Sequence, residues 1–104
     1  MDKEAFFSAV KLKSRAVRVP GTEIELTLQE LSAGGREELF SLCTGKGPHY
    51  IAAVAVALSC PDFTLDDVDR LLTEVNAEAL MKLSEQVFDL SGVSDDAVDD
   101  AKKD

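Results

Sequence analysis

Apolar and polar residues alternate in two short stretches near the N-terminal end of the chain, on either side of Pro20-Gly21. A period of two is typical of a strand with one buried face. Proline suits the second position of a type II turn, and glycine suits the third because it accepts a positive φ. The pattern therefore predicts a β-hairpin from about Ala16 to Leu28. Because an isolated hairpin is marginally stable in water, we expect it to lie against helices.

The remainder of the chain shows the three- and four-residue spacing of apolar positions that is typical of helices. Residues that begin or end helices separate the apolar segments: Ser32, Gly45, Pro48, Thr64, Asn76, Gly92 and Ser94. The spacing predicts helices over residues 33–43, 48–59, 65–75 and 77–90, a short N-terminal helix within 3–12, and a last segment beginning at Ser94. Gly34-Gly35 weakens the first turn of helix 33–43, so we expect that helix to begin late.

Two of the predicted helices have unusual apolar surfaces. Helix 48–59 is apolar on nearly every side, which places it in the middle of a bundle. Helix 77–90 has a stripe wider than one packing contact needs. Either both sides of this stripe are core, or one side binds a partner protein. The candidate partner-binding residues are Leu83, Val87, Phe88, Leu90 and Val93.

These patterns predict a mainly α fold: one small helical domain, residues 1–104, with a two-stranded β-hairpin near the N-terminus. We expect residues 1–15 and 93–104 to be loosely ordered. The composition, 45% hydrophobic and 30% charged, is typical of a globular domain. The longest apolar run, Tyr50–Leu58, is too short to cross a bilayer, and the N-terminus lacks the pattern of a signal peptide.

The distribution of charge indicates the class of partner. Eleven basic and twenty acidic side chains give a net charge of −9. The first 18 residues have five basic and two acidic groups, whereas the remainder has six and eighteen. Such an acidic body repels nucleic acid and anionic membranes, so we expect a protein partner. The basic residues Lys11, Lys13, Arg15 and Arg18 are interpreted as a solvated edge.

The side chains do not form a recognisable catalytic or cofactor site. His49 is the only histidine, which argues against catalytic triads and histidine-rich metal sites. Cys43 and Cys60 have no C-x-x-C pairing, and we expect both to be buried reduced thiols. We therefore expect no enzyme activity, no cofactor and no metal.

Two loops have partial ligand-binding motifs. Thr44-Gly45-Lys46-Gly47 is similar to a phosphate-binding loop, but Phe40 occupies the position of its first glycine. Asp62, Thr64 and Asp66 have the alternate spacing of a calcium loop, but the required glycine and glutamate are absent. Helix capping explains the second loop better.

Several short motifs follow one another along nearly the whole chain. Val17-Arg18-Val19-Pro20-Gly21 precedes the second strand, and an alanine-valine helix ends in Ser59-Cys60-Pro61-Asp62. The helix cap Phe63-Thr64-Leu65-Asp66-Asp67-Val68 follows, and Leu90-Ser91-Gly92-Val93-Ser94 precedes an acidic end. In this order, the motifs resemble the tail assembly chaperones of long, non-contractile-tailed (siphovirus-type) bacteriophages.

The resemblance implies a role in virion assembly and no catalytic residues. Such chaperones keep the tape measure protein soluble and help to recruit tail tube subunits in the host cytoplasm, and they are absent from the mature virion. Self-association of the chain is left open as a further interaction. In many of these phages a ribosomal frameshift near the end of the gene appends a second domain. Lys102-Lys103, whose codons can form a slippery run of adenines, lie where such a product would diverge.

Two other functions remain open at this stage. The first is an acidic α-helical regulatory or adaptor protein that binds one defined protein partner. The second is a DNA mimic, which the scattered positions of the acidic groups disfavour. The order of genes separates the chaperone from the regulator, because a chaperone gene should precede a very long reading frame that encodes a tape measure protein.

Overall fold

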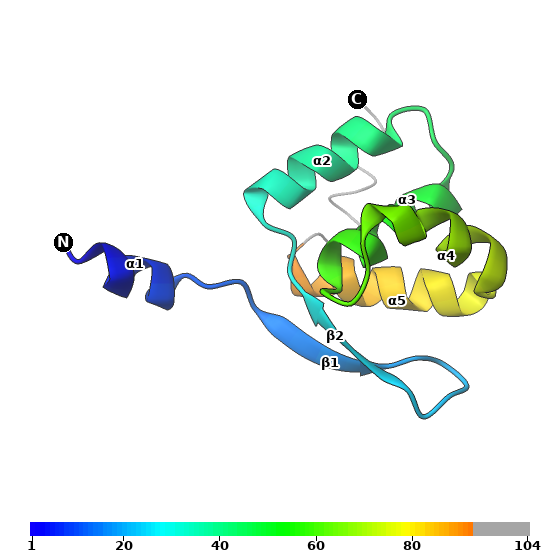
Figure 1. Cartoon of the computed structure of the whole chain (residues 1–104), viewed down its shortest axis with the longest axis horizontal. Helices are drawn as coiled ribbons and strands as arrows, with labels where there is room; N and C mark the ends of the chain where they lie inside the picture. Colours follow the sequence, from blue (N-terminus) through cyan, green and yellow to red (C-terminus); the bar gives the residue numbers. More distant parts are fainter. Residues whose placement is uncertain (93–104) are drawn as a thin grey trace.

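The computed structural model describes residues 1–92 and confirms the mainly α fold with one N-terminal hairpin. Figure 1 shows the hairpin beneath a group of helices, with the first helix extending to one side. The elements are α1 (Lys3–Ala9), β1 (Ser14–Arg18), β2 (Glu25–Gln29), α2 (Ala33–Cys43), α3 (Pro48–Ser59), the 3₁₀ turn η1 (Leu65–Asp67), α4 (Val68–Glu74) and α5 (Ala77–Leu90).

The hairpin forms at the predicted place, with strands that pair antiparallel from Ser14 opposite Gln29 to Arg18 opposite Glu25. The N–H of Thr22 donates to the carbonyl of Val19 at 3.1 Å, and Gly21 has a φ of 77°. The turn therefore uses glycine at the position where a side chain would be strained. Leu28 on the second strand is fully buried, which fixes the face of the hairpin that lies against the helices.

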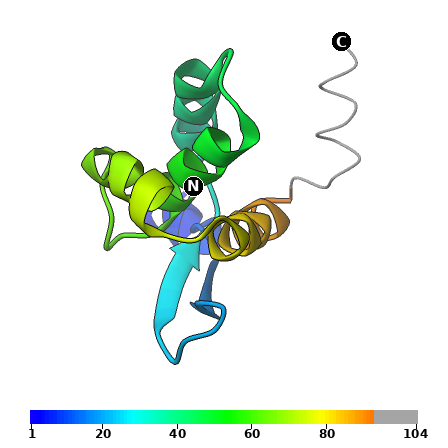
Figure 2. The same cartoon turned by 90° about the vertical axis from the view of Figure 1, so that its right-hand side faces the viewer.

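Helix α3 is the centre of the core, as its all-round apolar sequence predicts. Residues 52–57 are all buried, and α3 contacts α2, α4 and α5. The surrounding helices are visible in Figures 1 and 2. The hydroxyl of Ser59, also buried, donates to the carbonyl of Gln29 at 2.5 Å. This bond satisfies a polar group inside the core and ties β2 to the end of α3.

Helix α2 begins at Ala33, so the expectation of a late start is wrong. The Ser32 hydroxyl accepts a hydrogen bond from the N–H of Gly35 at 2.9 Å, which stabilises the first turn. A Cβ at Gly35 would lie 3.2 Å from that hydroxyl oxygen. Glycine at this position therefore makes room for the cap, and this local gain offsets its low helix propensity.

The predicted helix 65–75 has two parts, η1 and α4. The Thr64 hydroxyl and the Asp67 carboxylate form a reciprocal capping box around the first turn. The capping role predicted for Asp67 is confirmed. Asp67 occupies the position at which a capping box usually has glutamate. The side chain of Asn76 caps α5 by accepting from the N–H of Ala79 at 2.8 Å. Both helix starts therefore follow from the local sequence.

The N-terminal segment forms a helix where the sequence left open either loose order or a short helix. The carboxylate of Asp2 caps α1, and no residue of α1 is buried within the described chain. The expected last segment beginning at Ser94, together with Val93 and Lys102-Lys103, lies outside the described residues. Among residues 1–92, no helix has the length and apolar character needed to cross a membrane.

Candidate functional site

The apolar stripe of α5, the predicted partner-binding surface, lies mostly in the interior. Leu83 is 3% exposed, Val87 0% and Leu90 9%, and Phe88 is half-buried against the core. Val93 lies outside the described residues. The width of the stripe reflects its position, because α5 packs against α3 on one side and both strands on another. In this conformation the stripe offers a partner little more than the edge of Phe88.

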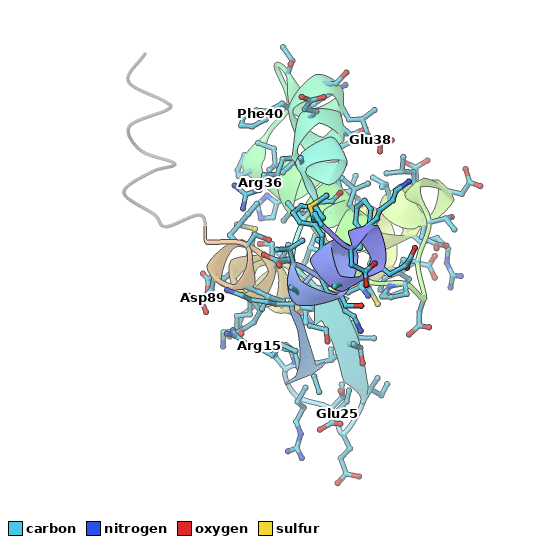
Figure 3. All side chains as sticks on the ribbon, turned by 90° about the vertical axis from the view of Figure 1, so that its left-hand side faces the viewer. Arg15, Glu25, Arg36, Glu38, Phe40 and Asp89 are labelled. Carbon is cyan, nitrogen blue, oxygen red and sulfur yellow. The ribbon has the colours of Figure 1, made fainter. Side chains whose placement is uncertain are left out.

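Polar contacts fix the hairpin to α5 along the outside of the same region. The guanidinium of Arg15 donates to the Gln86 side chain at 2.9 Å and to the Asp89 carboxylate at 3.0 Å. Figure 3 shows Arg15 and Asp89 on the same side of the molecule. The Arg15 side chain is 42% exposed and the Asp89 side chain 71%, so solvent screens this ion pair and it contributes at most about 1 kcal/mol. Arg15 therefore links β1 to α5 but adds little to the stability of the fold.

The N-terminal arm, defined here as residues 1–12, is the most prominent exposed apolar feature. It extends away from the helices in Figure 1. The rings of Phe6 and Phe7 lie edge to face, 5.3 Å apart, and are 49% and 57% exposed. Val10 and Leu12 are exposed as well, and Lys11 lies between them. Apolar side chains gathered on one projecting segment mark an interaction surface more often than single exposed ones do.

The helix in the arm has no evident internal source of stability. A seven-residue helix is too short to be stable alone in water, and α1 buries none of its residues against the rest of the described chain. Docking against another surface would supply the missing burial. The arm is therefore the strongest candidate for a binding element among residues 1–92.

A shallow groove of about 320 Å³ lies between the end of α2, the first half of α3, the 3₁₀ turn η1 and the start of α4. Val54 and Val68 form its buried floor, and Asp66 and Asp69 are exposed at its edge. The remaining lining residues are Leu42, Tyr50 and Leu65. We call this the acidic groove. Its apolar walls and negative edge suit an apolar segment that carries basic side chains.

A second hollow of about 260 Å³ lies between the hairpin and α5. Its charged lining residues are Arg18, Lys82 and Glu85, so its charge is mixed. The ammonium of Lys82 also pairs with Glu78 at 2.9 Å. This hollow therefore has less preference for the charge of a ligand than the acidic groove has.

The potentially reactive side chains considered from the sequence are Cys43, Cys60 and His49. Cys60 is buried, whereas Cys43 is only half-buried, so the expectation of two buried thiols holds for one of them. Burial raises the pKa of both thiols above the ordinary value, which lowers their reactivity at neutral pH. His49 is exposed next to Pro48 at the start of α3. Within residues 1–92 no cluster of potential metal ligands is present.

The exposure of the apolar side chains in the arm is the main feature that the sequence patterns did not reveal. Helical spacing predicted a short helix here but assigned no role to Phe7 or Leu12. The adjacent pair Phe6-Phe7 was an available signal, because neighbouring residues on a helix point in different directions and cannot both face one core.

Comparisons with models of protein families, with curated proteins and with solved structures find no match to this chain.

Proposed function

We propose that this protein is a tail assembly chaperone that keeps the tape measure protein of a long, non-contractile phage tail soluble. The observation that carries the proposal is the projecting arm with its exposed Phe6, Phe7, Val10 and Leu12. A chaperone of this class has to offer apolar surface to an apolar client. The motif order described above connects this general property with phage tails.

The charge of the rest of the molecule supports the same role. Residues 19–92 contain four basic and thirteen acidic side chains. A strongly negative body resists self-aggregation and keeps a bound apolar client in solution. The arm carries apolar contact surface, and the acidic body supplies solubility. Recruitment of tail tube subunits by a frameshift-extended form, in the cytoplasm of the bacterial host, belongs to the same proposal.

The second candidate is an adaptor that binds one defined protein partner. The acidic groove favours it, because a preformed hollow with apolar walls and a negative edge suits a single short segment. An adaptor of this kind would bind one sequence tightly, whereas a chaperone would bind many apolar segments of a long client.

Co-expression with the tape measure protein encoded by the neighbouring gene tests the proposed function. We expect the wild-type chain to shift that client from the pellet into the soluble fraction. The variant F6E/F7E should lose this effect and keep its melting temperature, because both rings lie outside the core. The matched control is F40E, since Phe40 is 72% exposed on α2 and points away from the arm in Figure 3.

Two outcomes would count against the chaperone. F6E/F7E solubilising the client as well as wild type does would remove the arm from the binding surface. The absence of a long reading frame directly after this gene would remove the client itself. A run of adenines at the codons of Lys102-Lys103, with an overlapping −1 frame, would support the extended form, and synonymous changes in that run should then abolish the longer product.

A further inference from the structure

We propose that residues 93–104, called here the C-terminal segment, lie antiparallel along the arm of the same molecule and cover its apolar side chains in the free protein. The contact concerns one chain alone and holds whatever client the protein serves. The C-terminal segment lies outside the described residues. The argument for the contact therefore uses the sequence of the segment, its length and the point at which it leaves the fold.

The C-terminal segment leaves the fold at the base of the arm. The N–H of Glu30 donates to the carbonyl of Lys13 at 2.8 Å, and the N–H of Leu31 donates to the hydroxyl of Ser91 at 2.8 Å. Because Glu30 and Leu31 are consecutive, the residue after the arm and the residue after α5 contact neighbouring positions of the chain. The contact between Arg15 and Asp89, visible on one side of the molecule in Figure 3, belongs to the same junction.

The length of the segment is sufficient to cover the arm. Twelve residues span about 40 Å when extended and about 18 Å as a helix. The seven residues of α1 are about 10 Å long, and residues 10–13 add at most about 14 Å. A segment that starts beside Lys13 can therefore run back along the arm as far as Phe6.

Charges at the base of the arm are complementary to the first part of the segment. Lys11 and Lys13 are exposed, and neither ammonium forms an ion pair within residues 1–92. Asp95 and Asp96 follow Ser91 by four and five positions. They come early in the segment, so an antiparallel path brings them close to these two lysines, where opposite charges attract.

The far end of the arm has the opposite charges, and so does the far end of the segment. Asp2 and Glu4 lie at the start of the arm, and Lys102-Lys103 lie near the other end of the segment. An antiparallel arrangement pairs unlike charges at both ends, whereas a parallel arrangement would pair like charges at both. The order of charges therefore favours a segment that folds back on the arm.

Apolar residues occupy the middle of both sequences. In the arm these are Phe6, Phe7 and Val10, all exposed within the described part of the chain. In the segment, Ala97, Val98 and Ala101 have the spacing of one helical face. Contact between the two faces would remove both from water and give α1 the packing that a seven-residue helix requires.

The two hollows of the body suit the C-terminal segment less well. The acidic groove would repel it, because Asp66 and Asp69 lie at the groove edge. The hollow beside the hairpin has basic groups, but its Lys82 is already paired with Glu78 at 2.9 Å. Leu83 on the wall of that hollow is buried and offers little apolar area. The arm therefore provides the best match in both charge and apolar surface.

Hydrogen exchange of backbone N–H groups, measured by NMR on the full chain, tests the contact. The N–H of Phe6 and the N–H of Val10 are hydrogen-bonded within the arm, to the carbonyls of Asp2 and Phe6. We expect both to exchange at least about ten-fold more slowly than in an unstructured chain, because the segment holds α1 in place. D95K/D96K should remove about five-fold of this protection, and high salt should reduce it as well.

Charge reversal on both sides provides the decisive comparison. K11E/K13E should lower the protection of α1 as D95K/D96K does, and the quadruple variant K11E/K13E/D95K/D96K should restore it at the wild-type net charge. The matched control is E23K/E37K, which changes net charge as D95K/D96K does at exposed positions in the hairpin turn and on α2. Circular dichroism melts of every variant check that the fold is intact.

Four results would overturn the proposal. The first is a wild-type chain in which α1 exchanges as fast as an unstructured peptide does. The second is equal protection of α1 in D95K/D96K and in E23K/E37K. The third is a quadruple variant that melts as wild type does but leaves α1 unprotected. The fourth is protection of α1 that rises with protein concentration, which would mean that another molecule covers the arm.

Discussion

The hydroxyl of Ser91 accepts a hydrogen bond from the backbone N–H of Leu31 at 2.8 Å, across 60 positions of sequence. Ser91 is buried, and its carbonyl also accepts a hydrogen bond from the guanidinium of Arg36. Ser91 directly follows α5. Through these two hydrogen bonds it joins the C-terminal end of α5 to Leu31, between β2 and α2, and to Arg36 on α2. The polar groups of this junction are satisfied by one another inside the fold.

Replacing Ser91 by alanine should lower the free energy of unfolding by about 1–3 kcal/mol, because the buried N–H of Leu31 loses its acceptor. Urea denaturation followed by circular dichroism measures the change. The control S41A removes an exposed hydroxyl from α2 and should alter stability by less than about 0.5 kcal/mol. Equal stability of the two variants would mean that water replaces the Ser91 hydroxyl.

Replacing Val54 by aspartate should unfold the domain. Val54 is 0% exposed in the centre of α3, and an unpaired buried charge costs several kcal/mol, a large part of the stability of a small domain. The loss of a cooperative thermal transition in circular dichroism is the expected result. F40D, with the same new charge on an exposed position, should melt close to wild type. An unchanged melting temperature for V54D would place α3 at the periphery.

Replacing Val87 by glutamate should abolish folding and client binding together. The Val87 side chain points from α5 into the core and is 0% exposed, so the new carboxylate would have no access to water. Soluble yield, melting temperature and co-expression with the client provide the measurements. A V87E protein that folds normally but no longer solubilises the client would assign the α5 stripe to the partner surface and contradict its placement in the core.

The two cysteines should differ in their rate of alkylation by iodoacetamide. Cys60 is 1% exposed and Cys43 is half-buried, so Cys43 should react first in the native protein. Because burial raises both thiol pKa values, both should react more slowly at neutral pH than in the urea-unfolded chain. The native rates should rise with pH through and above the ordinary thiol range. Mass spectrometry of peptides after timed quenching distinguishes the sites.

Local sequence was sufficient to predict most of the secondary structure of this protein. The alternation around Pro20-Gly21 identified the hairpin, and capping residues such as Ser32 and Asn76 set the starts of helices. These features depend on neighbours within four or five residues, so their physical causes are visible in the sequence. The uniform apolar character of residues 51–58 likewise placed α3 inside the bundle.

Only the tertiary structure decided which apolar surfaces are covered. The stripe of α5 and the arm both carry large apolar side chains at helical spacing, yet Val87 is buried and Phe7 is exposed. The difference arises because α5 lies between α3 and the hairpin, whereas the arm precedes β1 and extends past the helices. The spacing of apolar residues shows that a helix has an apolar face. It does not show which element covers that face, because the covering element lies far away along the chain. For the same reason, the acidic groove, built from α2, α3, η1 and α4, has no signature in any one segment.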